Sequence, residues 1–394
     1  MTLIYLIAGE QSGDVLGARL IRALRQLRPD LQFTGIGGAR MAETGFASLF
    51  PMDELAVMGL LEVLPRIFRL GRLLRDTVAD IHARRPDLVV TIDSPGFTLR
   101  VLRKIRGIKR VHYVAPQVWA WRQHRVRTFP GLWDRMLCLL PFEPAWFARH
   151  GVPGVFVGHP VLESGADTGN ADRFRAKHNL PANAPILILM PGSRRSEVPR
   201  LLPAFGQALA LLARQTPGLV AVVPTAGAVA DFVRRETAGW SVPPIVVTAL
   251  EDKHDAYAAA AAALTKSGTS TLELALAGIP MVVAYRLNPI TATLARRLLR
   301  VPYVAMVNLL AGRGLVPELL QQECRPERLA EELLILLADP AAAQAQRDGF
   351  RTVIASLAAP DGAPSFAAAA EVLRTLDAAQ STTETGIANA FTGR

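Results

Sequence analysis

The stretch LVVTIDSPGF, residues 88–97, has the pattern of a buried strand that ends in a polar turn. Leu88–Ile92 is apolar or β-branched throughout, which is typical of a parallel strand covered on both faces. Asp93 follows at once, and Pro95 and Gly96 end the strand. Because ligands bind at the carboxyl ends of strands in open α/β sheets, this carboxylate is predicted to lie at a binding edge as a general base. The alternative is a turn-initiating aspartate bonded to its own loop amides.

The same strand pattern recurs along the chain and alternates with longer helical patterns. Because the rhythm restarts after a polar segment, we predict an α/β protein with two doubly wound, Rossmann-like domains. The predicted strands are Leu3–Ala8, Gln32–Ile36, Leu88–Ile92, Arg110–Val114, Met136–Leu140, Pro185–Met190, Leu219–Val223, Ile245–Thr248, Ala262–Thr265 and Met281–Ala284.

The length of 394 residues also favours two domains, since one hydrophobic core rarely serves so long a chain. The segment Gly158–Asp172, rich in Gly, Asp and Asn, is predicted to link them. We place the first domain at residues 1–165 and the second at residues 172–345. Residues 346–380 are expected to form C-terminal helices, and the tail 381–394 lacks periodicity and is expected to be mobile.

The charge of the chain points to acidic partners. Lys and Arg outnumber Asp and Glu, and the net charge is +10. This balance favours nucleic acid, an anionic membrane or phosphorylated substrates, and the planar fork of Arg matches phosphate oxygens. An Arg- and Ala-rich proteome would produce the same balance without a function. Nucleic acid is disfavoured, because aromatic residues do not recur beside the basic ones.

Two features concern the compartment. Cys138 and Cys324 lack the spacing of a metal site or a disulfide framework, which indicates a reducing compartment. The N-terminal segment has no basic start and is predicted to be a strand rather than a signal peptide, and no apolar run reaches the length of a membrane span. We therefore expect a cytoplasmic protein, soluble or peripheral on a membrane.

Two further strand-end loops of the first domain are candidates for ligand binding. The loop AGEQSGD, residues 8–14, is expected to open a helix at Val15, and its glycines would allow close approach of the backbone to a ligand. An ordinary turn with Asp14 capping the helix is the alternative. The loop APQVWAWRQHRV, residues 115–126, sets two tryptophans beside basic residues, which suits a sugar, an acyl chain or a base. Its alternative is core tryptophans with solvated arginines.

Strand-end loops of the second domain suit a diphosphate. Residues 191–195 end a strand just before a helix, and amides at a helix start with an adjacent arginine form an anion site. The small residues 267–270 open another helix, in which Glu273 would accept hydrogen bonds from ribose hydroxyls or simply favour the helix start. No D-x-D pair occurs in the chain, so a carboxylate-held metal is not expected.

The segment Glu54–Asp76 combines large apolar residues with a rim of arginines. This composition is typical of an interfacial helix on an anionic membrane, and a core-facing helix with a solvated edge is the alternative. The candidate membrane-contact residues are Leu61, Val63, Leu64, Ile67, Phe68 and Leu70.

Taken together, these loops resemble one family of GT-B glycosyltransferases, the lipid-A-disaccharide synthases. The resemblance is carried by AGEQSGD, ELAVMGLLEVL, TIDSPGF, HYVAPQVWAWR, LPFE, VGHP, MPGSR, SGTSTLE, PMVVAYR and NLLAGRGLVPELLQ, which run in order from residue 8 to residue 321. It implies a GT-B fold, with two Rossmann-like domains facing across a cleft. It also implies that the first domain binds the acceptor and faces the membrane, that the second binds the UDP-sugar, and that the C-terminal helices pack back on the first.

The resemblance implies a defined reaction. Members transfer 2,3-diacylglucosamine from its UDP derivative to 2,3-diacylglucosamine 1-phosphate (lipid X), with inversion and without a metal or another cofactor. They work as peripheral proteins on the inner face of the inner membrane, and a homodimer is one assembly that the resemblance allows.

The same resemblance assigns roles to residues. Asp93 would be the general base that takes the proton from the acceptor 6-hydroxyl, and Arg194 would stabilise the departing diphosphate. Nucleotide-binding residues would be Gly192, Ser193, Ser267, Gly268, Thr269, Glu273, Asn308 and Arg313. Acceptor-loop residues would be Gly9, Glu10, Ser12, Gly13, Trp119 and Arg122.

One residue departs from the family pattern I-D-x-P-D-F, because Gly96 stands where the second Asp is common. The runner-up reading is another GT-B enzyme that uses UDP-N-acetylglucosamine, of the peptidoglycan transferase or 2-epimerase type. The stretches VWAWR and ELAVMG argue against it. A basic binding protein without catalysis would explain the charge but not the polar loops at the strand ends.

Overall fold

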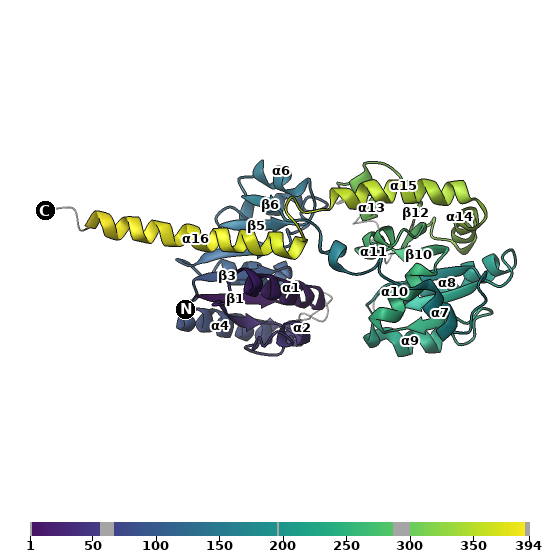
Figure 1. Ribbon diagram of the computed structural model, residues 1–394, viewed down its shortest axis with the longest axis horizontal. Helices are drawn as coiled ribbons and strands as arrows, with labels where there is room; N and C mark the ends of the chain where they lie inside the picture. Colours follow the sequence, from purple (N-terminus) through teal and green to yellow (C-terminus); the bar gives the residue numbers. More distant parts are fainter. Residues whose placement is uncertain (1, 56–66, 195–196, 287–299, 391–394) are drawn as a thin grey trace. The chain divides into compact units, whose positions relative to one another are not determined.

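The computed structural model describes residues 2–55, 67–194, 197–286 and 300–390. The chain divides into two compact units (Figure 1). Unit 1 comprises Met1–Pro160 and Leu357–Arg394, and unit 2 comprises Val161–Ser356. The boundary between them lies inside the segment that the sequence marks as a link.

Unit 1 contains a parallel sheet in the order β2-β1-β3-β4-β5-β6. Its strands are β1 Leu3–Ala8, β2 Gln32–Ile36, β3 Leu88–Ile92, β4 Lys109–Tyr113, β5 Arg135–Cys138 and β6 Gly154–Phe156. The chain order reverses at β1, so right-handed crossovers place helices on both faces. The helices are α1 Gln11–Leu27, α2 Ala39–Ala42, α4 Ile67–Arg84, α5 Pro95–Leu102, α6 Glu143–Ala148 and α16 Pro364–Ala390. Short 3₁₀ helices are η1 Met52–Glu54 and η3 Gln123–Thr128.

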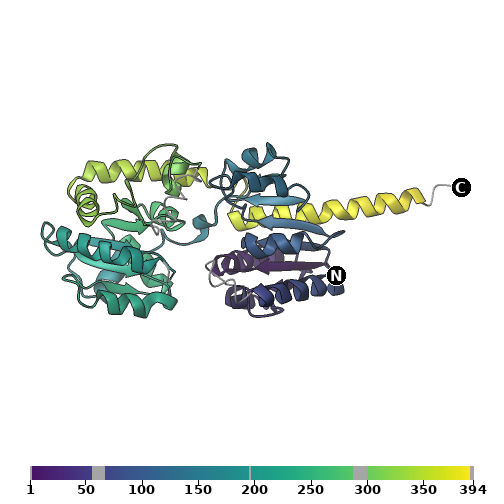
Figure 2. The same ribbon diagram turned by 180° about the vertical axis from the view of Figure 1, so that it is seen from behind.

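The C-terminal helix α16 belongs to unit 1. It lies beside α1 (Figures 1 and 2), and Ala368, Val372 and Leu376 are buried in the core of this unit. Arg28, the C-cap residue of α1, donates two hydrogen bonds of 2.8 Å to the carboxylate of Asp377. The helix bounds include residues 381–390, which the sequence analysis assigned to a mobile tail.

Unit 2 repeats the architecture with the parallel order β12-β11-β10-β7-β8-β9. Its strands are β7 Ile186–Met190, β8 Val220–Pro224, β9 Ile245–Val247, β10 Ala262–Lys266, β11 Met281–Tyr285 and β12 Glu318–Leu320. The helices are α7 Ala171–Lys177, α8 Val198–Ala213, α9 Gly227–Thr237, α10 Leu250–Ala258, α11 Ser270–Leu276, α13 Met306–Ala311, α14 Pro326–Ala338 and α15 Pro340–Ser356, with the 3₁₀ helix η4 Pro160–Glu163 at the boundary.

Three details differ from the sequence-based expectation. The edge strands β6 and β12, each of three residues, were not predicted. Helix α15 groups with unit 2, whereas residues 346–380 were expected to pack on the first domain. Helix α1 begins at Gln11 instead of Val15, because the amide of Asp14 already donates to the carbonyl of Glu10 at 2.9 Å.

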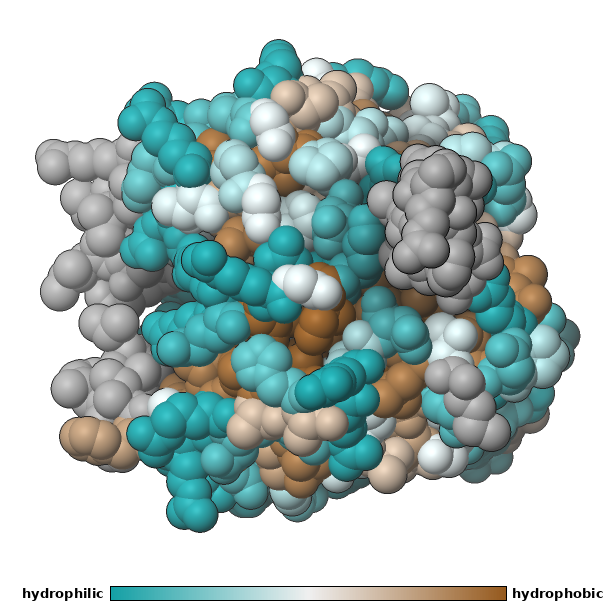
Figure 3. Space-filling model, turned by 90° about the vertical axis from the view of Figure 1, so that its left-hand side faces the viewer, coloured by the Kyte–Doolittle hydropathy of each residue, from teal (hydrophilic) through white to brown (hydrophobic). Residues whose placement is uncertain are grey.

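The surface mixes apolar and charged side chains. Figure 3 shows a face on which hydrophobic side chains (brown) lie in patches between hydrophilic ones (teal). Among the described residues, the large apolar side chain with the greatest exposure is Phe68, at 88%. In the described part of the chain, we find no helix both long and apolar enough to cross a membrane.

Candidate functional site

The predicted site residues of unit 1 gather at the carboxyl end of β1 and β3. These neighbouring strands flank the point where the chain order reverses, which is where open α/β sheets bind ligands. A Cβ atom on Gly9 would lie 2.7 Å from Ser94 Oγ, so only glycine lets the two strand-end loops approach this closely. The fold thus brings the segment after β1 against the turn that carries Asp93.

The turn at Asp93 has a strained backbone. Asp93 and Ser94 have φ values of 49° and 46°, in the left-handed region that costs a non-glycine residue about 1 kcal/mol or more. The surrounding hydrogen bonds hold this conformation: the Asp93 amide donates to the carbonyl of Tyr113 at 2.9 Å, and Thr98 Oγ1 donates to the carbonyl of Asp93 at 2.8 Å. Strain of this kind is concentrated at functional sites, where it fixes the direction of a side chain.

The alternative, a turn in which Asp93 bonds to its own loop amides, stays a prediction, and some of those amides are already used. The amides of Phe97 and Thr98 donate to the carbonyl of Ser94, at 3.0 and 3.1 Å, and Pro95 has no amide hydrogen. Three of the five amide positions after Asp93 are therefore already used or absent.

The segment after β1 is helical earlier than the sequence suggests. Glu10 is the N-cap residue of α1, Ser12 is exposed in its first turn, and Gly13 is buried against Ile92. Asp14 does not cap its own helix. Its carboxylate accepts hydrogen bonds from the amides of Gly38, Arg40 and Met41 at 2.8 to 3.0 Å, and so fixes the start of α2.

Trp119 lies in the core rather than on a ligand surface. Its side chain is buried, its Nε1 donates to Glu143 Oε1 at 3.0 Å, and its ring packs edge-on against Phe142. The prediction of a substrate contact at Trp119 is therefore wrong for this side chain. Trp121 is the exposed ring of the pair, and the Arg122 guanidinium stacks 4.4 Å from its centroid.

Glu143 was missed by the sequence analysis and ties this loop to the sheet. Besides Trp119, its carboxylate accepts hydrogen bonds from the amides of Leu139 and Leu140, both at 3.0 Å. Burial raises the pKa of Glu143 to about 7, because desolvation of the charge outweighs these donors. The signal in the sequence was an acidic residue at the start of α6, a few residues after β5.

This pKa predicts a pH dependence of stability. Between about 4.5 and about 7 the folded state holds the Glu143 proton that the unfolded state loses, so its contribution to the free energy of unfolding falls as the pH rises. The loss amounts to at most about 3 kcal/mol. Glu143→Gln, which stays neutral, should lose this slope, as measured by urea unfolding of both proteins from pH 4.5 to pH 7.5. Buried His112 and His159 contribute equally to both proteins and cancel, so equal slopes would contradict the prediction.

In unit 2 the predicted diphosphate loops follow β7 and β10, which flank the corresponding reversal of chain order. Gly192 has a φ of +126°, and a Cβ atom there would lie 2.8 Å from Glu197 Oε2. Ser193 is exposed, and Arg194 Nη1 lies 3.5 Å from Glu197 Oε1. The cation Lys266, absent from the predicted set, ends β10 and lies 2.8 Å from the same carboxylate oxygen.

The loop after β10 contains one buried hydroxyl group, which has a structural role, and one exposed hydroxyl group. Ser267 is buried, and its Oγ donates to the carbonyl of Val304 at 2.8 Å. Gly268 has a φ of +153°, and Thr269 is exposed at the start of α11. The Ser267 side chain therefore anchors the loop, which leaves Gly268 and Thr269 to face a ligand.

Glu273 lies in an ion pair rather than alone at a helix start. Lys253 Nζ donates to its Oε2 at 2.6 Å, and the Tyr257 hydroxyl donates to the same oxygen at 3.4 Å. Burial, together with the nearby Glu273 charge, raises the pKa of Tyr257 well above its ordinary value. The carboxylate is thus held in place by α10 and remains partly exposed.

Asn308, a predicted nucleotide-binding residue, fixes the loop before β12. It is buried, its Oδ1 accepts from the amides of Leu315 and Val316, and its Nδ2 donates to Val316 and Glu318. Glu318 in turn accepts from the amides of Val304 and Ala305, at the start of α13.

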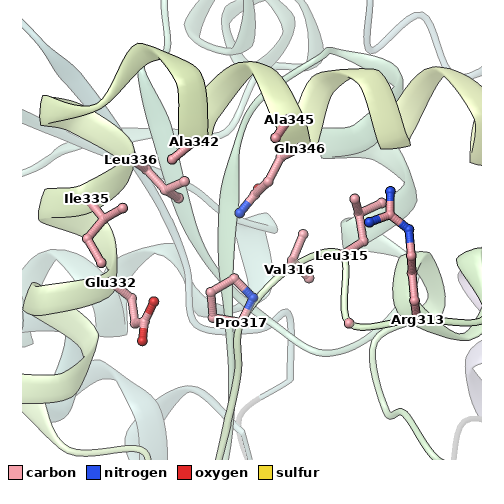
Figure 4. A pocket seen from close by; sticks show the side chains of 11 residues that line it. Arg313, Leu315, Val316, Pro317, Glu332, Ile335, Leu336, Ala342, Ala345 and Gln346 are labelled. Atoms are coloured by element: carbon pink, nitrogen blue, oxygen red, sulfur yellow. The ribbon is translucent and has the colours of Figure 1, made fainter.

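Arg313, the other predicted nucleotide-binding residue of this segment, follows α13 directly after Gly312. It lines a pocket of about 490 Å³ between its loop and helices α14 and α15 (Figure 4). Gln346, in the same pocket, accepts a hydrogen bond from the amide of Met281, the first residue of β11. Through Gln346 this pocket reaches the first residue of β11.

The membrane-contact candidates are only partly described. Leu61, Val63, Leu64 and the side chain of Ile67 lie outside the described residues. In the described part of α4, Phe68 is almost fully exposed, Leu70 is half-buried, and the side chains of Arg69 and Arg72 are mostly exposed. Within the described residues no group of His, Cys, Asp and Glu could hold a metal ion.

The chain matches known proteins over most of its length. The family model of lipid-A-disaccharide synthetase matches residues 4–365. The lipid-A-disaccharide synthase of Granulibacter bethesdensis is 62% identical over 387 residues, which covers 95% of this chain and 98% of that protein.

Solved structures show the same fold at low sequence identity. The UDP-GlcNAc 2-epimerase of Neisseria meningitidis, bound to UDP-GlcNAc, has a TM-score of 0.61 at 11% identity and covers 91% of this chain and 99% of that chain. The calicheamicin glycosyltransferase CalG4 has a TM-score of 0.60 at 18% identity, with 96% and 98% covered. The two parallel sheets are thus those of a GT-B fold, and on the match of residues 4–365 this chain belongs to the lipid-A-disaccharide synthetase family.

Proposed function

We propose that this chain joins UDP-2,3-diacylglucosamine to 2,3-diacylglucosamine 1-phosphate (lipid X), to give the β-1′,6-linked disaccharide 1-phosphate and UDP. Membership of the synthetase family supports the reaction class. The observation that carries the proposal is the strained turn that presents Asp93 at the binding edge of unit 1. A carboxylate fixed in direction at that edge is suited to act as a general base.

In this proposal Asp93 takes the proton from the 6-hydroxyl of lipid X. The oxygen then attacks C1 of the donor sugar, the bond between C1 and the diphosphate oxygen breaks, and UDP leaves with its electron pair. Attack opposite to the leaving group inverts the configuration at C1. Gly9, Glu10, Ser12 and Arg122, which lie on the segments around this edge, would bind the acceptor, whereas Gly13 packs under the site.

Unit 2 would bind the donor. Arg194 would neutralise the charge that develops on the departing diphosphate, in the electrostatic role that fixed donors have at such sites. Gly192, Ser193, Gly268 and Thr269 would offer their amides and hydroxyls to phosphate oxygens. Glu273, held by Lys253, would accept hydrogen bonds from the ribose hydroxyls.

The test is UDP release by the purified chain. We expect release from UDP-2,3-diacylglucosamine only when lipid X is present, and the disaccharide 1-phosphate should appear in equal amount by mass spectrometry. The runner-up predicts instead that UDP-N-acetylglucosamine is consumed, or epimerised without an acceptor. No turnover of the diacylated donor in detergent, with turnover of UDP-N-acetylglucosamine, would replace the proposal by the runner-up.

We also propose that the segment around α4 docks on the anionic inner face of the inner membrane, while the homodimer stays a prediction. An exposed phenylalanine with neighbouring arginines supports this surface, because apolar burial and charge attraction add at a lipid interface.

Phe68→Glu should weaken binding to vesicles that contain phosphatidylglycerol by about tenfold or more, since one buried apolar side chain contributes about 1.5 kcal/mol or more. Co-sedimentation measures the effect. Leu250→Glu, which changes an exposed apolar residue of unit 2, is the matched control. Equal binding of the Phe68 variant and the wild type would count against docking through α4.

A further inference from the structure

We infer that Lys266 is a diphosphate-binding residue of the donor site. The inference rests on the proposed function insofar as it takes a nucleoside diphosphate as the ligand. The sequence pattern did not identify Lys266 as a candidate site residue. Its position in the fold identifies it as one.

Lys266 stands at the reversal of chain order in unit 2. It is the last residue of β10, and Glu197 follows the neighbouring strand β7. Lys266 Nζ donates to Glu197 Oε1 at 2.8 Å, and about four-fifths of each side chain is buried. The ammonium group is therefore held between two strand-end loops, at the position where open α/β sheets bind their ligands.

Two glycines border the Lys266 side chain. A Cβ atom on Gly192 would lie 3.5 Å from Lys266 Cδ, and a Cβ atom on Gly268 would lie 3.9 Å from Lys266 Nζ. Both glycines have positive φ values, of +126° and +153°. Glycine turns of this kind expose backbone amides to an anion, and a lysine beside them adds a compact positive charge.

The charge around Glu197 suits an anionic ligand. Arg194 lies 3.5 Å from Oε1, the oxygen that Lys266 also contacts, so one carboxylate stands between two cations. The other oxygen, Glu197 Oε2, is buried without a hydrogen-bond partner in the described part of the chain. Two cations against one carboxylate leave a net positive charge for the diphosphate.

A purely structural ion pair between β7 and β10 is the competing explanation. This explanation predicts that removal of the ammonium group lowers the stability of the folded chain and weakens the binding of every ligand of unit 2 equally. A phosphate contact predicts a loss confined to ligands that carry the diphosphate. The two explanations therefore differ in the comparison of UDP with uridine.

The experiment measures binding of UDP by calorimetry, and of uridine by ligand-observed NMR, to the full-length chain. Lys266→Met should raise the Kd for UDP about 10- to 100-fold, the loss typical of a hydrogen bond to a charged group, and leave uridine binding unchanged. Lys266→Gln should have the same effect as Lys266→Met, because both variants remove the ammonium group. Agreement between them excludes a packing effect of the methionine side chain. Lys177→Met is the matched control, because Lys177 forms an equally short ion pair with Asp252, at 2.7 Å, in the same unit.

The outcomes separate this inference from the proposed function. If the wild type binds UDP and the folded Lys266 variants bind it equally well, the inference is overturned and the proposed function stands. Equal weakening of UDP binding and uridine binding would show instead that the ion pair is purely structural. A wild type that binds no UDP would refute the donor site itself.

Discussion

Replacing Asp93 by Asn is expected to lower kcat about 10²- to 10⁴-fold, the range that a positioned general base contributes. The change removes the proton acceptor and keeps the size of the side chain. Asn tolerates the left-handed backbone that Asp93 adopts, so the turn should persist. Binding of UDP should be unchanged, because its predicted site lies in unit 2.

The measurement is acceptor-dependent UDP release at saturating substrates. Asp30→Asn changes an exposed carboxylate of the same unit and should leave kcat unchanged.

Gly96 allows a second test of the prediction that Asp93 is the general base. Family members commonly carry a second Asp at this position, and a Cβ atom on Gly96 would meet nothing within 4 Å. The variant Gly96→Asp should therefore fold, and it should not restore activity to Asp93→Asn. Restoration, or an Asp93→Asn enzyme within a few fold of the wild type, would show that another carboxylate can serve as the base.

The strands could be predicted because parallel strands buried on both faces leave a continuous apolar signal. Each predicted strand occurs within two residues of its expected bounds. The edge strands β6 and β12 left no such signal, since three residues such as GVF or ELL are too short to stand out.

The missed strand β12 also limited what could be said of the segment before it. Without β12, the loop 312–317 could not be assigned to an edge of the sheet, and Asn308 and Arg313 were assigned only from the family resemblance. The strand shows that this loop leads into the amino end of β12. Asn308 fixes the loop from inside, through four hydrogen bonds that a one-dimensional pattern cannot reveal.

The partners of individual side chains could not be predicted from the sequence either. Two tryptophans in one loop did not reveal which ring is buried, because the answer depends on Glu143, far along the chain. Likewise, Lys266 and Glu197 are 69 positions apart and meet only through the pairing of β7 with β10. By contrast, the places of Asp93 and Arg194 followed from strand ends alone, since Asp93 comes directly after β3 and Arg194 comes four residues after β7.

Replacing Arg194 by Ala is expected to lower kcat about 10²- to 10³-fold, the loss seen when a fixed donor to a developing charge is removed. The leaving diphosphate gains negative charge as its bond to C1 breaks, so a cation that contacts it stabilises the transition state more than the ground state. UDP affinity should fall by a smaller factor, because Lys266 remains in the site.

Arg200→Ala is the control for this prediction, since Arg200 is an exposed arginine in the first turn of α8, a few residues further along. It removes the same charge from the same helix end, at a position inside the helix and further along the chain from Gly192. If long-range attraction were the whole effect of Arg194, both variants would lose activity alike, and the loss would shrink with added salt. A large loss confined to Arg194→Ala, and retained at high salt, would mean that the guanidinium acts by contact with the leaving group.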